Sequence, residues 1–128
     1  VFISAVGPTE LEAGAAMPEA IETMVTFLGD AVIADGGIEV FLSEDLELDE
    51  DEDFLLSVWT PWALGGVSSG DFEVEVDDME SVPEEFASST AFVLVRVTLT
   101  RVWGLDGNVV VNVPGPTCDV DFFVVEVE

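Results

Sequence analysis

The densest group of side chains able to do chemistry is the segment Glu44–Asp53, in which eight of ten residues are acidic. Within it, Asp49, Asp51 and Asp53 alternate like the first three ligands of a calcium-binding loop. Such a loop needs glycine at its sixth position for a sharp turn, and that position is Phe54 here. The three aspartates are therefore candidate ligands for Ca²⁺ or Mg²⁺. The simpler interpretation is a solvated loop screened by diffuse Na⁺ and K⁺, with no specific metal or other cofactor.

Other residue types that commonly act in catalysis are few in this chain. The chain has no histidine and no lysine, and Cys118 is its only cysteine, so the usual bases and nucleophile pairs are missing. Paired carboxylates remain, as in glycoside hydrolysis, but 28 acidic residues produce many accidental pairs. A general acid also needs an apolar pocket that raises its pKa, and no carboxylate in the sequence is marked in this way. We therefore expect no catalytic residues and no enzyme. A single cysteine excludes an internal disulfide and a zinc-cysteine site.

The residues that depart from the acidic composition are two arginines and three tryptophans. Arg96 and Arg101 are the only cations of the chain, and each could pair within the subunit or clamp a neighbour's carboxylates bidentately. Trp59, Trp62 and Trp103 could be core residues, but an exposed tryptophan would mark a binding hot spot. All five are candidates for a partner interface.

The net charge of −26 is the strongest single feature of the sequence. On a folded domain of this size, that charge costs on the order of 60 kcal/mol in unscreened water. Screening reduces the cost to roughly 20 kcal/mol at a Debye length of about 10 Å, and below ~10 kcal/mol at about 3 Å, near 1 M salt. Folding stability is only about 5–15 kcal/mol. The acids also recur along the whole chain and do not form one tail, so the sequence predicts a halophilic protein. Its composition resembles that of haloarchaeal proteins and of their viruses.

The charge also restricts the partners. Direct binding to nucleic acid needs clustered Lys or Arg, and an anionic membrane surface needs the same. No apolar run approaches the length of a membrane span, and the first residues lack the basic segment of a signal peptide. We expect protein partners, no nucleic acid and no membrane.

The first third of the chain predicts one strand and one helical region. Val1–Val6 is a short apolar strand, or an arm that pairs with a neighbouring subunit. Residues 9–34 are expected to be helical, because Pro18 suits a first helical position and Gly36-Gly37 suits a left-handed stop. The apolar stripe at helical spacing consists of Ile21, Met24, Val25, Leu28, Ala31 and Val32.

Everything from residue 38 to residue 127 reads as β structure. Apolar or alternating runs are bounded by Gly, Pro and acidic residues, and valine is the most frequent apolar residue. Gly65–Gly70 reads as a flexible connector that lacks the features of a phosphate loop. The expected strands are Ile38–Leu42, Phe54–Thr60, Phe72–Val76, Ala91–Trp103, Asn108–Val113 and Val120–Val127.

Two of these strands, Ala91–Trp103 and Val120–Val127, carry apolar residues on both faces, which indicates burial on both sides. One helix can cover only part of one face. We therefore predict a single β-rich domain over residues 1–128, of α+β class but mostly β. Its body is an antiparallel β-sandwich or a barrel-like structure with one packed N-terminal helix.

These features together predict a function without catalysis. The first hypothesis is a structural or assembly subunit of a haloarchaeal or haloarchaeal-virus particle, such as a capsid, turret or tail component, located in the virion or another high-salt assembly. It would form a homo-oligomer or a larger assembly, which is credible because molar salt screens the repulsion between subunits. The alternative is a small ligand- or metal-binding regulatory domain in the cytoplasm of a halophile.

Overall fold

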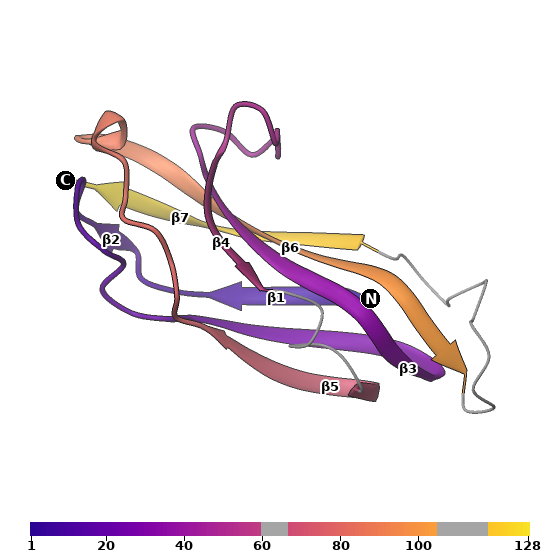
Figure 1. Ribbon diagram of the computed structural model, residues 1–128. Coiled ribbons are helices and arrows are strands. Elements are labelled where there is room, and N and C mark those ends of the chain that lie inside the picture. Colours follow the sequence, from indigo (N-terminus) through magenta and orange to yellow (C-terminus); the bar gives the residue numbers. More distant parts are fainter. Residues whose placement is uncertain (60–66, 105–117) are drawn as a thin grey trace.

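The fold is that of a computed structural model, which describes residues 1–59, 67–104 and 118–128. Within these ranges, the side chains of residues 28–35, 67–69, 72 and 101–104 are not described. Seven strands and one 3-10 turn make up the described elements (Figure 1). They are β1 (Phe2–Val6), β2 (Glu10–Leu11), β3 (Ile21–Ser43), β4 (Phe54–Trp59), β5 (Val67–Val76), η2 (Glu84–Phe86), β6 (Ser89–Gly104) and β7 (Cys118–Val127).

The long strand β3 organises the sheet because it pairs with four other strands. Its first part pairs with β1 on one side and β5 on the other. Its second part pairs with β6 on one side and β4 on the other. Register shifts between Phe27 and Val32, and around Asp35, separate the two parts. Bulges of this kind bend a strand, and β3 turns from one half of a curled sheet into the other (Figure 1).

The predicted helix over residues 9–34 is wrong. Thr9–Leu11 lies beside the end of β7, and residues 21–34 belong to β3. The buried residues of this stretch alternate at period two, because the side chains of Ile21, Thr23, Val25 and Phe27 all point inward. The same segment also matches a helical period, and the strand wins because neighbouring strands pair with it on both sides.

Gly36-Gly37 does not form the predicted left-handed stop. Both glycines lie inside β3, where they pair with Leu99 and Thr98 of β6. Gly37 is needed for close approach, since a Cβ atom there would lie 2.9 Å from the backbone oxygen of Trp59. The pair therefore shapes the sheet surface and does not end an element.

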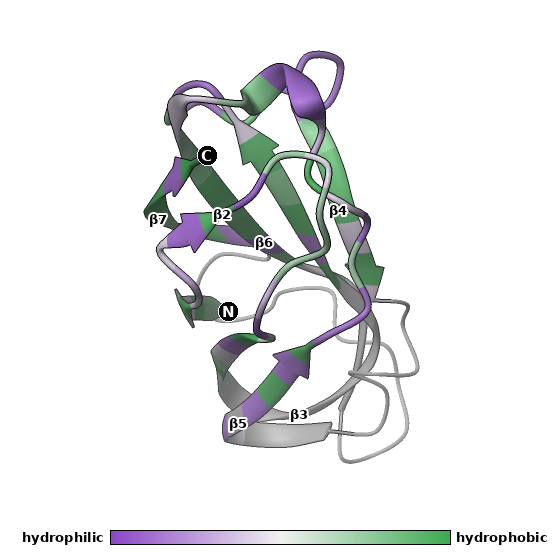
Figure 2. Ribbon diagram, turned by 90° about the vertical axis from the view of Figure 1, so that its left-hand side faces the viewer, coloured by the Kyte–Doolittle hydropathy of each residue, from purple (hydrophilic) through white to green (hydrophobic). Residues whose placement is uncertain are grey.

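Most strands predicted after residue 38 are confirmed. Ile38–Leu42 lies in β3, and Phe54–Thr60 corresponds to β4. The predicted strands Ala91–Trp103 and Val120–Val127 correspond to β6 and β7. On β5, Val74 and Val76 are buried while Glu73 and Glu75 are exposed, so one face of this strand is solvated. Figure 2 shows this alternation as hydrophilic and hydrophobic bands along β5. The prediction that Gly65–Gly70 is a connector is wrong from residue 67 onward, where β5 begins, and residues 65 and 66 lie outside the described ranges. Residues 108–113 lie outside the described ranges.

The protein is therefore mostly β, and in the part of the chain that the structure describes its only helical element is the single turn η2. No helix among the described residues has the length and apolar character needed to cross a membrane. The main core lies inside the curl of the sheet and contains side chains from all seven described strands, including Leu11, Ile21, Val25, Val93 and Val125.

The curl closes where β1 comes beside β7, and carboxylates make the closing contacts. The backbone N–H of Ile3 donates to Asp119 Oδ2 at 2.9 Å, and the N–H of Ala5 donates to Asp121 Oδ2 at 2.8 Å. Further along, β2 pairs with β7 in parallel through the backbone. Between the two regions, Gly7 passes over Phe123, because a Cβ atom at Gly7 would lie 2.6 Å from the ring. Two acidic side chains thus serve as internal acceptors that complete the edge of β1.

Replacing Asp121 tests this closure. We expect Asp121→Leu to be less stable than Asp121→Asn by about 1–3 kcal/mol, because leucine leaves the partly buried N–H of Ala5 without this acceptor. Both variants lose the same charge, so the comparison isolates the hydrogen bond from general repulsion. The measurement is urea unfolding at constant high salt. Equal midpoints for the two variants would show that the contact contributes nothing.

Candidate functional site

The candidate site lies on the outer face, which we define as the surface of β4, the second part of β3, β6 and β7 that points away from the core. Strand register arranges this surface in cross-strand rows. One row runs Leu55, Phe41, Leu94 and Phe122, and the next runs Val58, Glu39, Arg96 and Val120. A further row pairs Ser43, Phe92 and Val124. The face is thus mainly apolar, with one charged pair near its centre.

Over Asp119–Val124 the alternation of β7 is inverted relative to the usual pattern of a half-exposed strand, whereas buried Val125 and Val127 and exposed Glu126 follow that pattern. Its acids Asp119 and Asp121 point toward β1, whereas Val120, Phe122 and Val124 point outward and are 41%, 48% and 45% exposed. The prediction that this strand is buried on both faces is therefore wrong within the single chain. For β6 it holds only in the middle of the strand, because Leu94 on the outer face is 1% exposed while Phe92 and Thr98 are partly exposed and Thr100 is exposed. The alternation of DVDFFV was visible in the sequence, but not which side faced the core.

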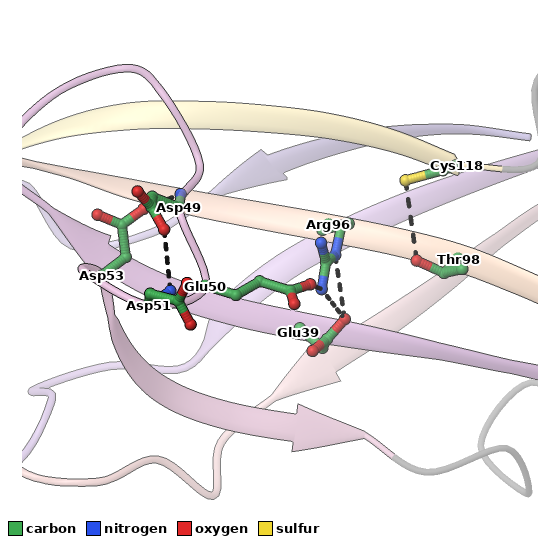
Figure 3. A network of polar contacts seen from close by, with 8 residues as sticks. All are labelled: Glu39, Asp49, Glu50, Asp51, Asp53, Arg96, Thr98 and Cys118. Atoms are coloured by element: carbon green, nitrogen blue, oxygen red, sulfur yellow. Dashed lines mark hydrogen bonds and ion pairs between the residues drawn. The ribbon is translucent and has the colours of Figure 1, made fainter.

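Arg96 joins the outer face to the acidic loop. Its guanidinium donates to Glu39 Oε1 from Nε at 3.0 Å and from Nη2 at 2.6 Å, and Nη2 also lies 2.5 Å from Glu50 Oε1. Glu39 is its register partner on β3, while Glu50 reaches in from the loop between β3 and β4, as Figure 3 shows. The guanidinium also lies over the ring of Phe41, 5.4 Å from the centroid. Such a contact is favourable where the cation is partly desolvated.

The two carboxylates differ in how firmly they are held. The side chain of Arg96 is 17% exposed and that of Glu39 is 29% exposed, whereas Glu50 is 63% exposed. Burial works to lower the pKa of Arg96, but its hydrogen bonds to Glu39 and Glu50 outweigh this effect and raise that pKa above its ordinary value. Arg96 is therefore a permanent cation with one fixed partner and one solvent-facing partner.

A hollow of ≈ 490 Å³ lies beside this ion pair. The row next to Arg96 carries only small side chains, because Gly37 pairs with Thr98 and Thr98 pairs with Cys118. Val58 forms one wall and Glu50 closes the side toward the acidic loop. The Thr98 hydroxyl is 3.8 Å from the Cys118 sulfur across the floor (Figure 3). The depression exists because the glycine, threonine and cysteine of this row leave it unfilled.

The aspartates considered as metal ligands serve the loop itself. The N–H of Asp49 donates to Asp53 Oδ2 at 2.8 Å, and the N–H of Asp51 donates to Asp49 Oδ1 at 2.9 Å. Side-chain acceptors of this kind hold turns together. Among the described residues, no group of three or more His, Cys, Asp or Glu side chains is placed to hold a metal ion. A site for Ca²⁺ or Mg²⁺ at Asp49, Asp51 and Asp53 stays a prediction.

The other predicted interface residues are only partly placed. Trp59 ends β4, is half-buried and packs against the core. Arg101 and Trp103 lie in β6 opposite Asp35 and Val32 of β3, and their side chains are not described. Trp62 lies outside the described residues. Among the predicted interface residues whose side chains are described, Arg96 lies on the outer face and Trp59 lines the hollow beside it. The structure adds Glu39, Glu50 and Phe122, which sequence reasoning did not single out.

Comparison with known proteins assigns no family. No protein-family model matches the chain, and no curated protein matches it. A solved structure described as a superoxide reductase (neelaredoxin) from Ignicoccus hospitalis is similar with a TM-score of 0.45 and 9% identity, covering 100% of this chain and 81% of that chain. This likeness carries no argument about function. The case for a function therefore depends on the residues of this chain.

Proposed function

We propose that this chain is a non-catalytic assembly subunit that works in molar salt and associates with further copies through its outer face. The inverted alternation of β7 is the observation that carries the proposal. Three successive outward positions of β7, Val120, Phe122 and Val124, are apolar although the chain has 28 acidic residues, and the acid Glu126 follows only at the end of the strand. High salt strengthens the burial of apolar groups, so in brine this row favours contact with another surface.

The size of the apolar row is consistent with the centre of an interface. Five side chains of the outer face are 40–52% exposed, namely Leu55, Val58, Val120, Phe122 and Val124. Together they present on the order of 400 Å² of apolar surface, comparable to the functional patches of monomeric proteins. A standard interface buries about 800 Å² per partner, so a rim of similar area would complete it.

Charge favours a second copy as the partner. A basic protein would be matched best by the acidic surfaces, such as the one formed by Asp71, Glu73 and Glu75 on β5. Two copies that each carry a charge of −26 can approach closely only where acids are sparse and salt screens the rest. A two-fold contact of the outer face with itself fulfils both conditions. A particle of a haloarchaeon or of its virus is the setting that fits best, with the assembly or virion as its location.

Phe122→Glu tests the assembly. In about 3 M KCl, where charges are screened beyond ~3 Å, we expect the wild type to oligomerise and Phe122→Glu to stay monomeric with an unchanged fold. Val6→Glu is the matched control, because Val6 is 67% exposed and lies on β1, which is not one of the four strands of the outer face. Analytical ultracentrifugation and circular dichroism give both readouts. A wild type that remains a compact monomer at every concentration in this salt would refute the proposal.

A further inference from the structure

The hollow beside Arg96 carries an inference that goes beyond assembly. It combines the permanent cation Arg96 with an apolar wall at Val58. The solvent-facing carboxylate of Glu50, from the same chain, already forms an ion pair with this cation. Glu39 is fixed to the sheet by its position in β3, so it keeps one side of the guanidinium neutralised. The other side of the guanidinium contacts Glu50, a loop residue whose side chain is 63% exposed.

We infer that the hollow binds a small carboxylate with an apolar body, whose carboxylate takes the place of Glu50 on Arg96. The exchange keeps the number of carboxylates on the guanidinium constant, and the displaced carboxylate of Glu50 is released to solvent. Planar guanidinium groups suit carboxylates particularly well. The apolar part of the ligand would lie over Gly37 and Thr98, against Val58.

Competition with Glu50 determines which carboxylates can bind. A side chain on a short loop has an effective concentration on the order of millimolar, so a bare carboxylate such as acetate gains no advantage over it. A ligand must add apolar contacts, and a volume of ≈ 490 Å³ accommodates a single ring. An aromatic monocarboxylate is therefore the class that fits. Glu50 acts as an internal stand-in that lowers the apparent affinity for this ligand.

The test uses benzoate as the probe, titrated into the full chain in about 3 M KCl, where the general field is screened. We expect weak saturable binding to the wild type and at least about tenfold tighter binding to Glu50→Gln, because the competing carboxylate is removed. Glu47→Gln removes the same charge from the same loop and is expected to behave like the wild type. Arg96→Gln is expected to abolish binding, and benzamide, which lacks the charge, is expected not to bind.

A chemical-shift measurement and a second protein background make the binding test decisive. Amide chemical shifts in Glu50→Gln should change around Gly37, Thr98 and Cys118, which locates the site even if Arg96→Gln does not fold. The titrations are repeated in the Phe122→Glu background, so that an assembly covering the outer face cannot conceal the hollow. The inference is overturned if Glu50→Gln shows no saturable binding in either background, if Glu47→Gln gains as much affinity, or if the shifts lie elsewhere.

Discussion

Transfer from about 3 M to about 0.1 M KCl is expected to unfold this protein, because the Debye length rises from below about 3 Å to about 10 Å. The electrostatic cost of the folded state then rises from below ~10 to roughly 20 kcal/mol, which exceeds a typical stability of about 5–15 kcal/mol. The unfolded chain also repels itself, so the net change is smaller, but its direction is fixed. Circular dichroism in the β-sheet band, together with tryptophan fluorescence, follows the transition.

The register of β3 and β5 identifies one place where repulsion concentrates. Glu22 of β3 lies directly opposite Glu75 of β5, and Glu73 and Asp71 follow on the same exposed face. Like charges directly opposite each other destabilise a sheet. We therefore expect Glu75→Gln to lower the salt concentration at the midpoint of unfolding more than Glu19→Gln, which removes an exposed acid from a loop. Secondary structure that stays constant over the whole salt range would contradict the halophilic interpretation.

Local patterning was sufficient for the later strands and insufficient for the first third of the chain. β4, β6 and β7 follow from apolar runs bounded by turn residues. In residues 21–28, Ile21 and Val25 fit both the helical stripe and the strand alternation, so periodicity could not decide. The deciding contacts are to β1, β5 and β6, and most of those residues are remote in sequence. Pairing of this kind is a tertiary effect that overrides local propensity.

The candidate site could be predicted only in its components. Arg96 was identified as an exceptional cation, but its partner Glu39 is 57 residues away and becomes adjacent only through strand register. The hollow depends on Gly37, Thr98 and Cys118 meeting in one row, and these residues come from three strands. For β7, the sequence shows apolar residues on both faces, and such a pattern does not distinguish burial in the chain from burial against another subunit.

The ion pairs of Arg96 provide the second large expected effect. We expect Arg96→Gln to lose about 1–3 kcal/mol of stability, because it leaves the carboxylate of Glu39 uncompensated in a largely apolar face. The value lies below that for a fully buried pair, since Glu39 is 29% exposed. Because the pKa of Arg96 is raised in the fold, its contribution is complete below the ordinary arginine pKa and is lost only as pH rises beyond it. Mutation, and not alkaline pH, is therefore the practical way to remove this charge.

Second-site changes separate the two partners of Arg96. In the Arg96→Gln background, Glu39→Gln should restore part of the lost stability, because it removes a half-buried charge that no longer has a partner. Glu50→Gln should restore little, because Glu50 is 63% exposed and water solvates it once it is released. Urea unfolding at constant salt gives the free energy of unfolding of Arg96→Gln and of the two double variants, since urea leaves the ionic strength unchanged. Equal rescue by both changes would mean that general charge reduction, and not the pairing on the outer face, controls the stability of this region.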